Sequence, residues 1–438
     1  MLFLLLPSAA PAQDRAAAPS PLTLERAIED ALAQNPSLRA ARLGVDAAAA
    51  STTASRSAEF PRVSFTESWQ RGDQPVFVFS TLLASRRFAA SNFAIDSLNH
   101  PDPIGYFHAT AGIEQVFFDG GSIGASVDSA RAKHQIADIS AREAALTLAS
   151  TVTETYGRLL ATQAQGRASA ASLDAGREDV ARAERRRDAG ITSEADVLAL
   201  RVHVADLEQR VIQSDGEQVI LRARLNQLMG APLDRRFEAV EPTIAIDAAS
   251  PPLAQLLAEA DSQRPEIQRA AASALLADSS RRAAKSSLAP RVAGQAAFDM
   301  SGTSFPDRAS AWLVGAEVRW SLGLGGGERA QMNAAAAEAA RARAEAEDAR
   351  AQIEVEVVTA LQQLASARSR QAVGRAAVAQ SRESYRIIRD RYDAGLAPVT
   401  DVLRAAGAVL DADSQRVSAL VDEVMGAARL RRAVGRLQ

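Results

Sequence analysis

The chain has 438 residues, a formal net charge of −3, 24% charged residues and 47% hydrophobic residues. This ordinary balance excludes a disordered chain, a collagen-like fibre and a bundle of membrane-spanning helices. The chain contains no cysteine, which excludes disulfides, thiolate metal sites, a cysteine nucleophile and a lipid-anchored start. A net charge this close to zero argues against a nucleic-acid partner.

Residues 1–12 are expected to be a secretory signal peptide. An apolar run, Leu2–Leu6, precedes the small-residue sequence Ala10-Pro11-Ala12, so the mature chain should begin at Gln13. No later stretch reaches the roughly 18 apolar residues that a membrane-spanning helix needs. The chain is therefore expected to be exported, and any membrane-embedded part to be a β-barrel. The alternative is a hydrophobic start without a targeting role.

Aromatic residues and prolines divide the chain into two kinds of segment. Fifteen of the 20 aromatic residues lie within residues 60–118 and 298–320, where apolar and polar residues alternate as in strands. Residues 104–231 and 307–397 contain no proline. Because proline breaks helix interiors, these two segments can hold unusually long helices.

The sequence contains an internal duplication. Residues 35–38 match residues 264–267 at an offset of 229, and residues 186–191 match residues 391–396 at an offset of 205. Offsets this long indicate a duplicated unit rather than a short-period solenoid. The difference of 24 between the offsets predicts extra chain in the first copy, between Val63 and about Gln115.

The mature chain therefore divides into repeats 13–235 and 236–438, each with the order helix, β-hairpin, long helix, turn and helix. The expected β-hairpins are at about residues 60–118 and 290–322, and the expected turns are at residues 189–192 and 394–398. The first long helix should run from Ser122 to Asp188, which corresponds to roughly 100 Å. In the helix after it, seven apolar residues between Leu200 and Leu228 fill heptad core positions, as in a coiled coil.

These features together resemble the TolC-type outer-membrane efflux proteins, over nearly the whole mature chain. The most specific motifs are the paired turns, Arg186…Gly190-Ile191…Asp196-Val197-Leu198 and Arg391…Gly395-Leu396…Asp401-Val402-Leu403. The resemblance implies a mainly α fold with a β-barrel part. Long antiparallel coiled-coil helices would form a trimeric α-barrel tunnel, and four strands from each chain would form a 12-stranded membrane β-barrel.

The resemblance also implies a location and a function. The protein would lie in the outer membrane, in contact with its lipid, and extend into the periplasm as a homotrimer. It would be the passive exit duct of a tripartite efflux pump or type I secretion system for small molecules or polypeptides. Its partners would be a periplasmic adaptor, also called a membrane fusion protein, and an inner-membrane transporter.

The resemblance implies an entrance gate near the turns. Tyr392 and Asp196 match a family tyrosine and aspartate that hold the entrance shut, and they would link neighbouring helix pairs. Asp401 matches an acid that forms a ring inside the entrance, where three copies would favour cations. Arg404 and Ala397 depart from the family pattern, since they replace a second acid and a gate arginine. The alternative is that Tyr392 only packs and that Asp196 is a solvated acid at a helix start.

The turn tips are the family's docking region for adaptors. The expected docking residues are Arg186, Gly190, Ile191, Arg391, Gly395 and Leu396. Both glycines are also expected to adopt φ > 0 at a helix C′ position. Docking and helix termination are compatible roles for the same residues.

Three tryptophans are expected near membrane interfaces. Trp69, Trp312 and Trp320 lie at or near the ends of predicted strands, where membrane barrels carry aromatic girdles. The alternative is that these strands belong to a sandwich in a soluble domain.

No motif indicates an enzyme. The four histidines are scattered without metal-ligand spacing, and the glycine-rich segment 323–327 lacks the Gly-Lys-Ser/Thr of a phosphate loop. We therefore expect neither catalysis nor a cofactor or metal. The main alternative function is a periplasmic adaptor or coiled-coil scaffold. Adaptors, however, have one helical hairpin and a flanking lipoyl-type domain, not two duplicated hairpins with aromatic strands.

Overall fold

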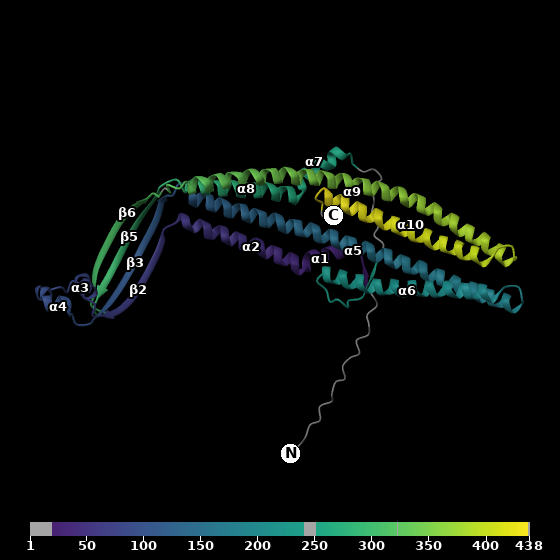
Figure 1. Cartoon of the computed structure of the whole chain (residues 1–438), viewed down its shortest axis with the longest axis horizontal. Helices are drawn as coiled ribbons and strands as arrows, with labels where there is room; N and C mark the ends of the chain where they lie inside the picture. Colours follow the sequence, from purple (N-terminus) through teal and green to yellow (C-terminus); the bar gives the residue numbers. More distant parts are fainter. Residues whose placement is uncertain (1–19, 241–250, 322, 437–438) are drawn as a thin grey trace, which may run out of the picture. The chain divides into compact units, whose positions relative to one another are not determined.

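The computed structural model describes residues 20–240, 251–321 and 323–436 (Figure 1). The expected signal peptide lies outside these residues. The described chain is mainly helical and divides into two compact units. The helical unit comprises the residues up to Leu43, Ile139–Ile267 and Asp348–Gln438. The sheet unit comprises Gly44–Asp138 and Gln268–Glu347.

The sheet unit contains one antiparallel sheet with the strand order β2-β3-β5-β6 (Figure 1). Its strands are β2 (Arg62–Gly72), β3 (Ile104–Phe118), β5 (Arg291–Gly302) and β6 (Ala309–Arg319). One β-hairpin comes from each half of the chain, and the two hairpins join through β3 and β5. Helices α3 (Pro75–Ala84) and α4 (Ile95–Asn99) lie in the connection between β2 and β3.

The two faces of this sheet differ because side chains alternate along each strand. Phe65, Ala111, Phe298 and Trp312 are paired in one row across all four strands. The next row contains polar groups, and in it the Thr110 hydroxyl donates a hydrogen bond to the Asp299 carboxylate at 2.6 Å. In the first row, Phe65 is 72% exposed and Trp312 is 77% exposed. One face of the isolated sheet is thus apolar and uncovered, and the other is polar.

The helical unit contains the ends of two long helices and the two helices that follow them. Helices α5 (Ser122–Asp188) and α9 (Gly327–Asp393) have 67 residues each. Helix α6 (Glu194–Leu228) runs back along α5, and α10 (Val399–Ala433) runs back along α9 (Figure 1). We call α5 with α6 the first helical hairpin, and α9 with α10 the second.

The predicted heptad positions form the core of the helical unit. Leu207 and Leu225 of α6 are buried, as are Val152 and Leu159 of α5. Val357 repeats the position of Val152 in the second half of the chain and is fully buried as well. The heptad pattern predicted for α6 therefore identified its packed face correctly.

Shorter elements complete the helical unit at the break between two helices in each repeat. The first break separates α1 (Leu24–Gln34) from α2 (Pro36–Arg56), and the second separates α7 (Leu253–Gln263) from α8 (Pro265–Ser286). Asn35 occupies the first break, and its side-chain amide donates to the carbonyl of Leu228 at 2.8 Å.

Arg264 occupies the second break and donates to the carbonyl of Arg432 at 3.1 Å. In each half of the chain, the side chain at the break thus bonds to the end of the last helix of that half. The first half uses an asparagine and the second half an arginine.

A short parallel ladder joins β1 (Ser20–Leu22) to β4 (Phe237–Ala239). The buried Tyr156 hydroxyl lies 2.7 Å from the carbonyl oxygen of Leu22 and 2.6 Å from that of Val240. Burial raises the pKa of the Tyr156 phenol to about 12.

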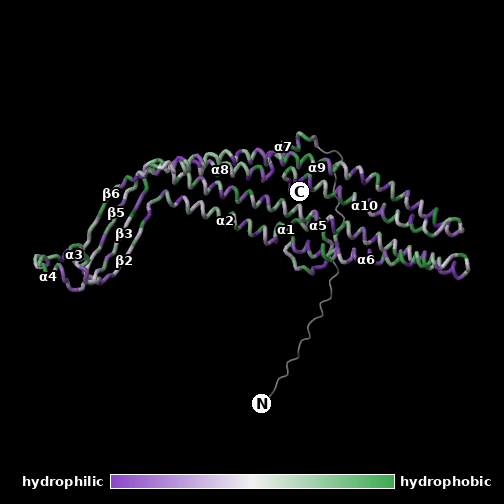
Figure 2. Tube along the Cα trace, viewed as in Figure 1, coloured by the Kyte–Doolittle hydropathy of each residue, from purple (hydrophilic) through white to green (hydrophobic). Residues whose placement is uncertain are grey.

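Hydrophobic and hydrophilic residues are mixed along the long helices (Figure 2). Among the helices in the described part of the chain, none combines the length and apolar character that crossing a membrane requires.

Candidate entrance site

The first helical hairpin ends in a Schellman turn at Gly190. The N–H of Ile191 bonds to the carbonyl of Arg186 at 2.9 Å, and the N–H of Gly190 bonds to the carbonyl of Arg187 at 2.8 Å. These bonds satisfy the last carbonyls of α5, and they require a left-handed residue at the C′ position. Gly190 supplies it with φ +73°.

The second helical hairpin ends in the same way at Gly395, which has φ +75°. The N–H of Leu396 bonds to the carbonyl of Arg391 at 2.8 Å, and the N–H of Gly395 bonds to that of Tyr392 at 2.9 Å. The expected positive φ is confirmed at both glycines. The two turn segments that match in sequence therefore also share the same backbone geometry.

Each turn presents one large apolar side chain to solvent. Ile191 is 64% exposed and Leu396 is 70% exposed. Arg391 is also exposed. These three of the six expected docking residues have accessible side chains, and the two glycines shape the turns that carry them.

Arg186 is different from the other expected docking residues. Its side chain is only 17% exposed, and it donates to the backbone carbonyl of Asp393 in the second hairpin. Its guanidinium also lies over the Tyr392 ring, 5.1 Å from the centroid. Arg186 therefore joins the two hairpins behind the tip instead of projecting from it.

A small core from both hairpins lies under the tips. Val197 of α6 is fully buried, and it shares a cluster with Tyr392, Val399 and Val402 of the second hairpin. The Tyr392 hydroxyl faces the first hairpin and lies 3.3 Å from the hydroxyl of Thr192. The phenol ring is thus packed while its polar end reaches across to the neighbouring helix pair.

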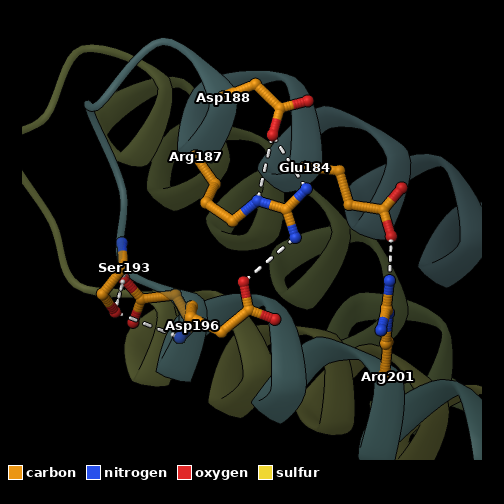
Figure 3. A network of polar contacts seen from close by, with 7 residues as sticks. Glu184, Arg187, Asp188, Ser193, Asp196 and Arg201 are labelled. Carbon is orange, nitrogen blue, oxygen red and sulfur yellow. Dashed lines mark hydrogen bonds and ion pairs between the residues drawn. The ribbon is translucent and has the colours of Figure 1, made fainter.

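Asp196 caps the start of α6. Its carboxylate accepts hydrogen bonds from the Ser193 hydroxyl at 2.9 Å, the Ser193 N–H at 3.2 Å and the Thr192 hydroxyl at 3.1 Å. The Ser193 hydroxyl in turn accepts from the Asp196 N–H, which completes a capping box (Figure 3). Burial acts to raise the pKa of Asp196, but these hydrogen bonds outweigh burial and hold the pKa below its usual range.

The structure therefore brings Tyr392 and Asp196 together through Thr192 rather than directly. The Thr192 hydroxyl donates to Asp196 and lies within hydrogen-bonding distance of the Tyr392 hydroxyl. Thr192, two residues after Gly190, was not predicted from the sequence as part of the site. Its position between the turn glycine and the capping box could have indicated this role.

Ion pairs hold the first turn together. Arg187 binds Asp188 at 2.8 Å and Glu194 at 3.0 Å, which links the end of α5 to the start of α6. Arg201 binds Glu184 at 2.6 Å one step further along the hairpin (Figure 3). These partly exposed pairs fix the geometry of the turn more than they add stability.

Asp401 lies in the first turn of α10 and pairs with Arg404 at 3.0 Å. Asp401 is 39% exposed and Arg404 is 79% exposed. The positive charge of Arg404 therefore opposes the negative charge of Asp401. Among the described residues, no group of three or more His, Cys, Asp or Glu could hold a metal ion.

The family model of the outer membrane efflux protein matches residues 27–231 and 256–436, which is most of the chain and includes both turns. The chain belongs to the outer membrane efflux protein family. It is thus an outer-membrane protein that extends into the periplasm, in a family of efflux channels.

Solved structures share the fold of this efflux protein. A membrane protein from Pseudomonas aeruginosa is 20% identical with a TM-score of 0.81, and the match covers 94% of this chain and 90% of that one. The outer membrane protein VceC from Vibrio cholerae is 21% identical with a TM-score of 0.80, covering 94% and 96%. The outer membrane channel CmeC from Campylobacter jejuni is 16% identical with a TM-score of 0.82, covering 94% and 85%. No curated protein matches the chain.

The three tryptophans of this efflux protein lie on or beside the sheet. Trp69 pairs with Phe107 near one end of the sheet, and Trp312 pairs with Phe298 three residues after the start of β6. Trp320 directly follows β6 at the other end. All three are at least 59% exposed. An interfacial position in the membrane stays a prediction for each of them.

Proposed function

We propose that this efflux protein is the exit duct of a tripartite efflux pump or a type I secretion system. Small molecules or polypeptides would pass through it passively, from a periplasmic entrance to the outside, without catalysis or a cofactor. The observation that carries the proposal is the pair of equivalent Schellman turns at the ends of duplicated helical hairpins, in a chain that belongs to the efflux family.

A homotrimer is supported by a second apolar stripe on α6. Leu198, Val202, Ile212 and Val219 are between 51% and 72% exposed, and they do not belong to the face that packs against α5. They are 4, 10 and 7 residues apart, which are sums of alternating steps of four and three. Within the chain α6 already contacts α5 and α10, and the exposed stripe is a further apolar face that these contacts leave open. We assign this face to the next copy of the chain, and three copies of the four-stranded sheet to a 12-stranded barrel.

The exposed tips support an adaptor as the periplasmic partner. Ile191 and Leu396 are apolar, accessible and equivalent by duplication, so three chains would present six similar contacts. Apolar side chains gathered at one end of an assembly and surrounded by polar residues are typical of a site where another protein binds. The inner-membrane transporter would deliver the substrate through the adaptor.

The entrance gate is proposed at Tyr392, Asp196 and Asp401. Tyr392 would hold the second hairpin to the first through Thr192, while Asp196 fixes the position of that threonine. Asp401 would contribute negative charge to the entrance, reduced by its pair with Arg404.

The test is conductance of the purified full-length protein in a planar bilayer, together with heat-modifiable trimers in outer-membrane fractions. We expect stable trimers and discrete conductance steps. Val202→Asp should disrupt the trimer, because it places a charge in the second stripe, whereas Val202→Leu is the matched control and should assemble. A monomeric protein without conductance, found in the soluble periplasmic fraction, would instead favour the adaptor or scaffold interpretation.

A further inference from the structure

A second tyrosine joins the two helical hairpins, one heptad before Tyr392. The Tyr385 hydroxyl of α9 donates a hydrogen bond to the Asp179 carboxylate of α5 at 2.6 Å. Asp179 is 9% exposed, and its other oxygen lies 3.6 Å from Arg182. Burial, together with the hydrogen bond to Asp179, raises the pKa of the Tyr385 phenol, so it stays protonated and remains a donor.

This contact differs in kind from the one at Tyr392. The Tyr392 hydroxyl meets a neutral hydroxyl, Thr192, at 3.3 Å, whereas Tyr385 meets a buried carboxylate at 2.6 Å. Hydrogen bonds to an ionised acceptor are shorter and roughly twice as strong as neutral ones. Of these two tyrosine contacts, the one at Tyr385 is therefore the stronger.

The space beside this contact is not filled by side chains. A pocket of about 540 Å³, partly open to solvent, lies between the four helices, and both Tyr385 and Asp179 line it. Side chains are therefore not close-packed on this side of the contact, and close packing is what resists displacement of one helix past another. Near Tyr385 the two hairpins are thus joined by a hydrogen bond that lies beside an unfilled pocket. This arrangement would allow the hairpins to separate.

Arg182 extends the contact toward the tip. It lies 3.6 Å from Asp179 and 3.5 Å from Asp393, which follows Tyr392 at the end of α9. Arg182 thus crosses between the hairpins once, at Asp393, and connects that contact to Asp179 within α5. A change at Tyr385 should reach the tip through this connection.

We infer that Tyr385 and Asp179 form the main tyrosine contact that keeps the two helical hairpins of each chain together, and that Tyr392 is secondary to it. The inference rests on the proposed function, in which separation of the hairpins opens the entrance. Tyr385 is a positioning residue: it acts by fixing α9 against α5.

The first measurement is the ratio of open to closed states of the full-length protein in a planar bilayer. Tyr385→Phe keeps the ring and removes only the hydroxyl. It should raise the ratio by roughly tenfold or more, as expected for loss of a hydrogen bond to a charged group. Tyr392→Phe is the matched control and should raise it by roughly two- to tenfold, as expected for a neutral partner. Asp179→Asn should fall between wild type and Tyr385→Phe, because an uncharged acceptor remains.

The second measurement does not depend on conduction. The chain has no cysteine, so spin labels can be attached at Ile191→Cys and Leu396→Cys, one on each tip. Labelled chains are diluted with unlabelled ones so that only distances within a chain are recorded. Adding Tyr385→Phe should lengthen or broaden the distance distribution, and adding Tyr392→Phe should change it less.

Unchanged distances in the Tyr385→Phe protein would overturn the inference, whether or not the protein conducts. Unchanged conductance in Tyr385→Phe alongside an opened Tyr392→Phe channel would overturn it too, but would leave the duct in place. Absence of any wild-type conductance would count against the duct alone, and the distance measurement would still decide the role of Tyr385.

Discussion

Gly395→Ala tests the physical basis of the entrance turns. Gly395 has φ +75°, and a Cβ built on it meets nothing within 4 Å. The substitution therefore adds no clash, and its cost is the left-handed backbone alone, about 1–2 kcal/mol for a residue with a Cβ. A cost of this size corresponds to roughly 5- to 30-fold more frequent opening of the turn.

The assay is hydrogen exchange at the amides of residue 395 and Leu396, which bond to the carbonyls of Tyr392 and Arg391. We expect both amides to exchange faster in Gly395→Ala. Gly407→Ala is the matched control, because Gly407 lies inside α10, has open space at its Cβ and no positive φ. Alanine should stabilise that helix by up to about 1 kcal/mol. Equal exchange at residues 395 and 396 in wild type and Gly395→Ala would show that the turn's φ does not govern its stability.

Three further predictions concern other parts of the molecule. Arg264→Ala should lower the free energy of unfolding in urea by about 1.5–3 kcal/mol, because it removes the hydrogen bonds of a buried guanidinium to Glu266 and Glu356, which are themselves partly exposed. Arg341→Ala, in an exposed set of pairs, should cost less than about 1 kcal/mol. Tyr156→Phe should remove the step in tyrosinate absorbance near pH 12. Since the pKa of the phenol is higher in the folded chain than in the unfolded one, its contribution to stability is present below about pH 10 and is lost as the pH rises through about 12. Brominated lipids should quench the fluorescence of all three tryptophans, and an unquenched one would require its strand to be placed outside the membrane.

The long helices and the turns could be predicted from the sequence because local rules determine them. The predicted first long helix, Ser122 to Asp188, has the same bounds as α5. Absence of proline, heptad spacing and a glycine at each turn all act within a few residues of one another. Pro398 is the N-cap of α10 and directly precedes the helix.

The partners of the site residues could not be predicted, since they depend on how distant hairpins pack. Arg186 was expected at the tip surface, but its long side chain reaches Asp393, 207 residues away. Tyr392 and Asp196 were expected to meet, and a hydroxyl from Thr192 lies between them. Spacing along one helix places a residue on a face, but it does not determine which atoms across the interface come within 3 Å.

The extra chain of the first repeat shows another limit. The offsets located it between Val63 and Gln115, yet its helices α3 and α4 were not predicted. The α3 sequence, Pro75–Ala84, is ten residues rich in aromatic and β-branched side chains, which favour strands. The helix forms in contact with β3 and β5, so tertiary packing overrides a local preference that points elsewhere.

The duplicated turns are equal in backbone geometry but unequal in side-chain support. The first has Ser193 and Asp196 as a capping box, with Arg187 bridging the two helices. In the second, the N-cap of α10 is Pro398, which makes no side-chain hydrogen bond. A missing cap of this kind is worth about 1 kcal/mol. The Asp401 N–H bonds to the backbone carbonyl of Pro398 at 3.1 Å instead of to a capping side chain. The start of α10 is therefore held more by its packing against the first hairpin than by its own turn. Contacts between the hairpins, at Tyr385 and at Tyr392, consequently matter more for the position of the second hairpin than for that of the first.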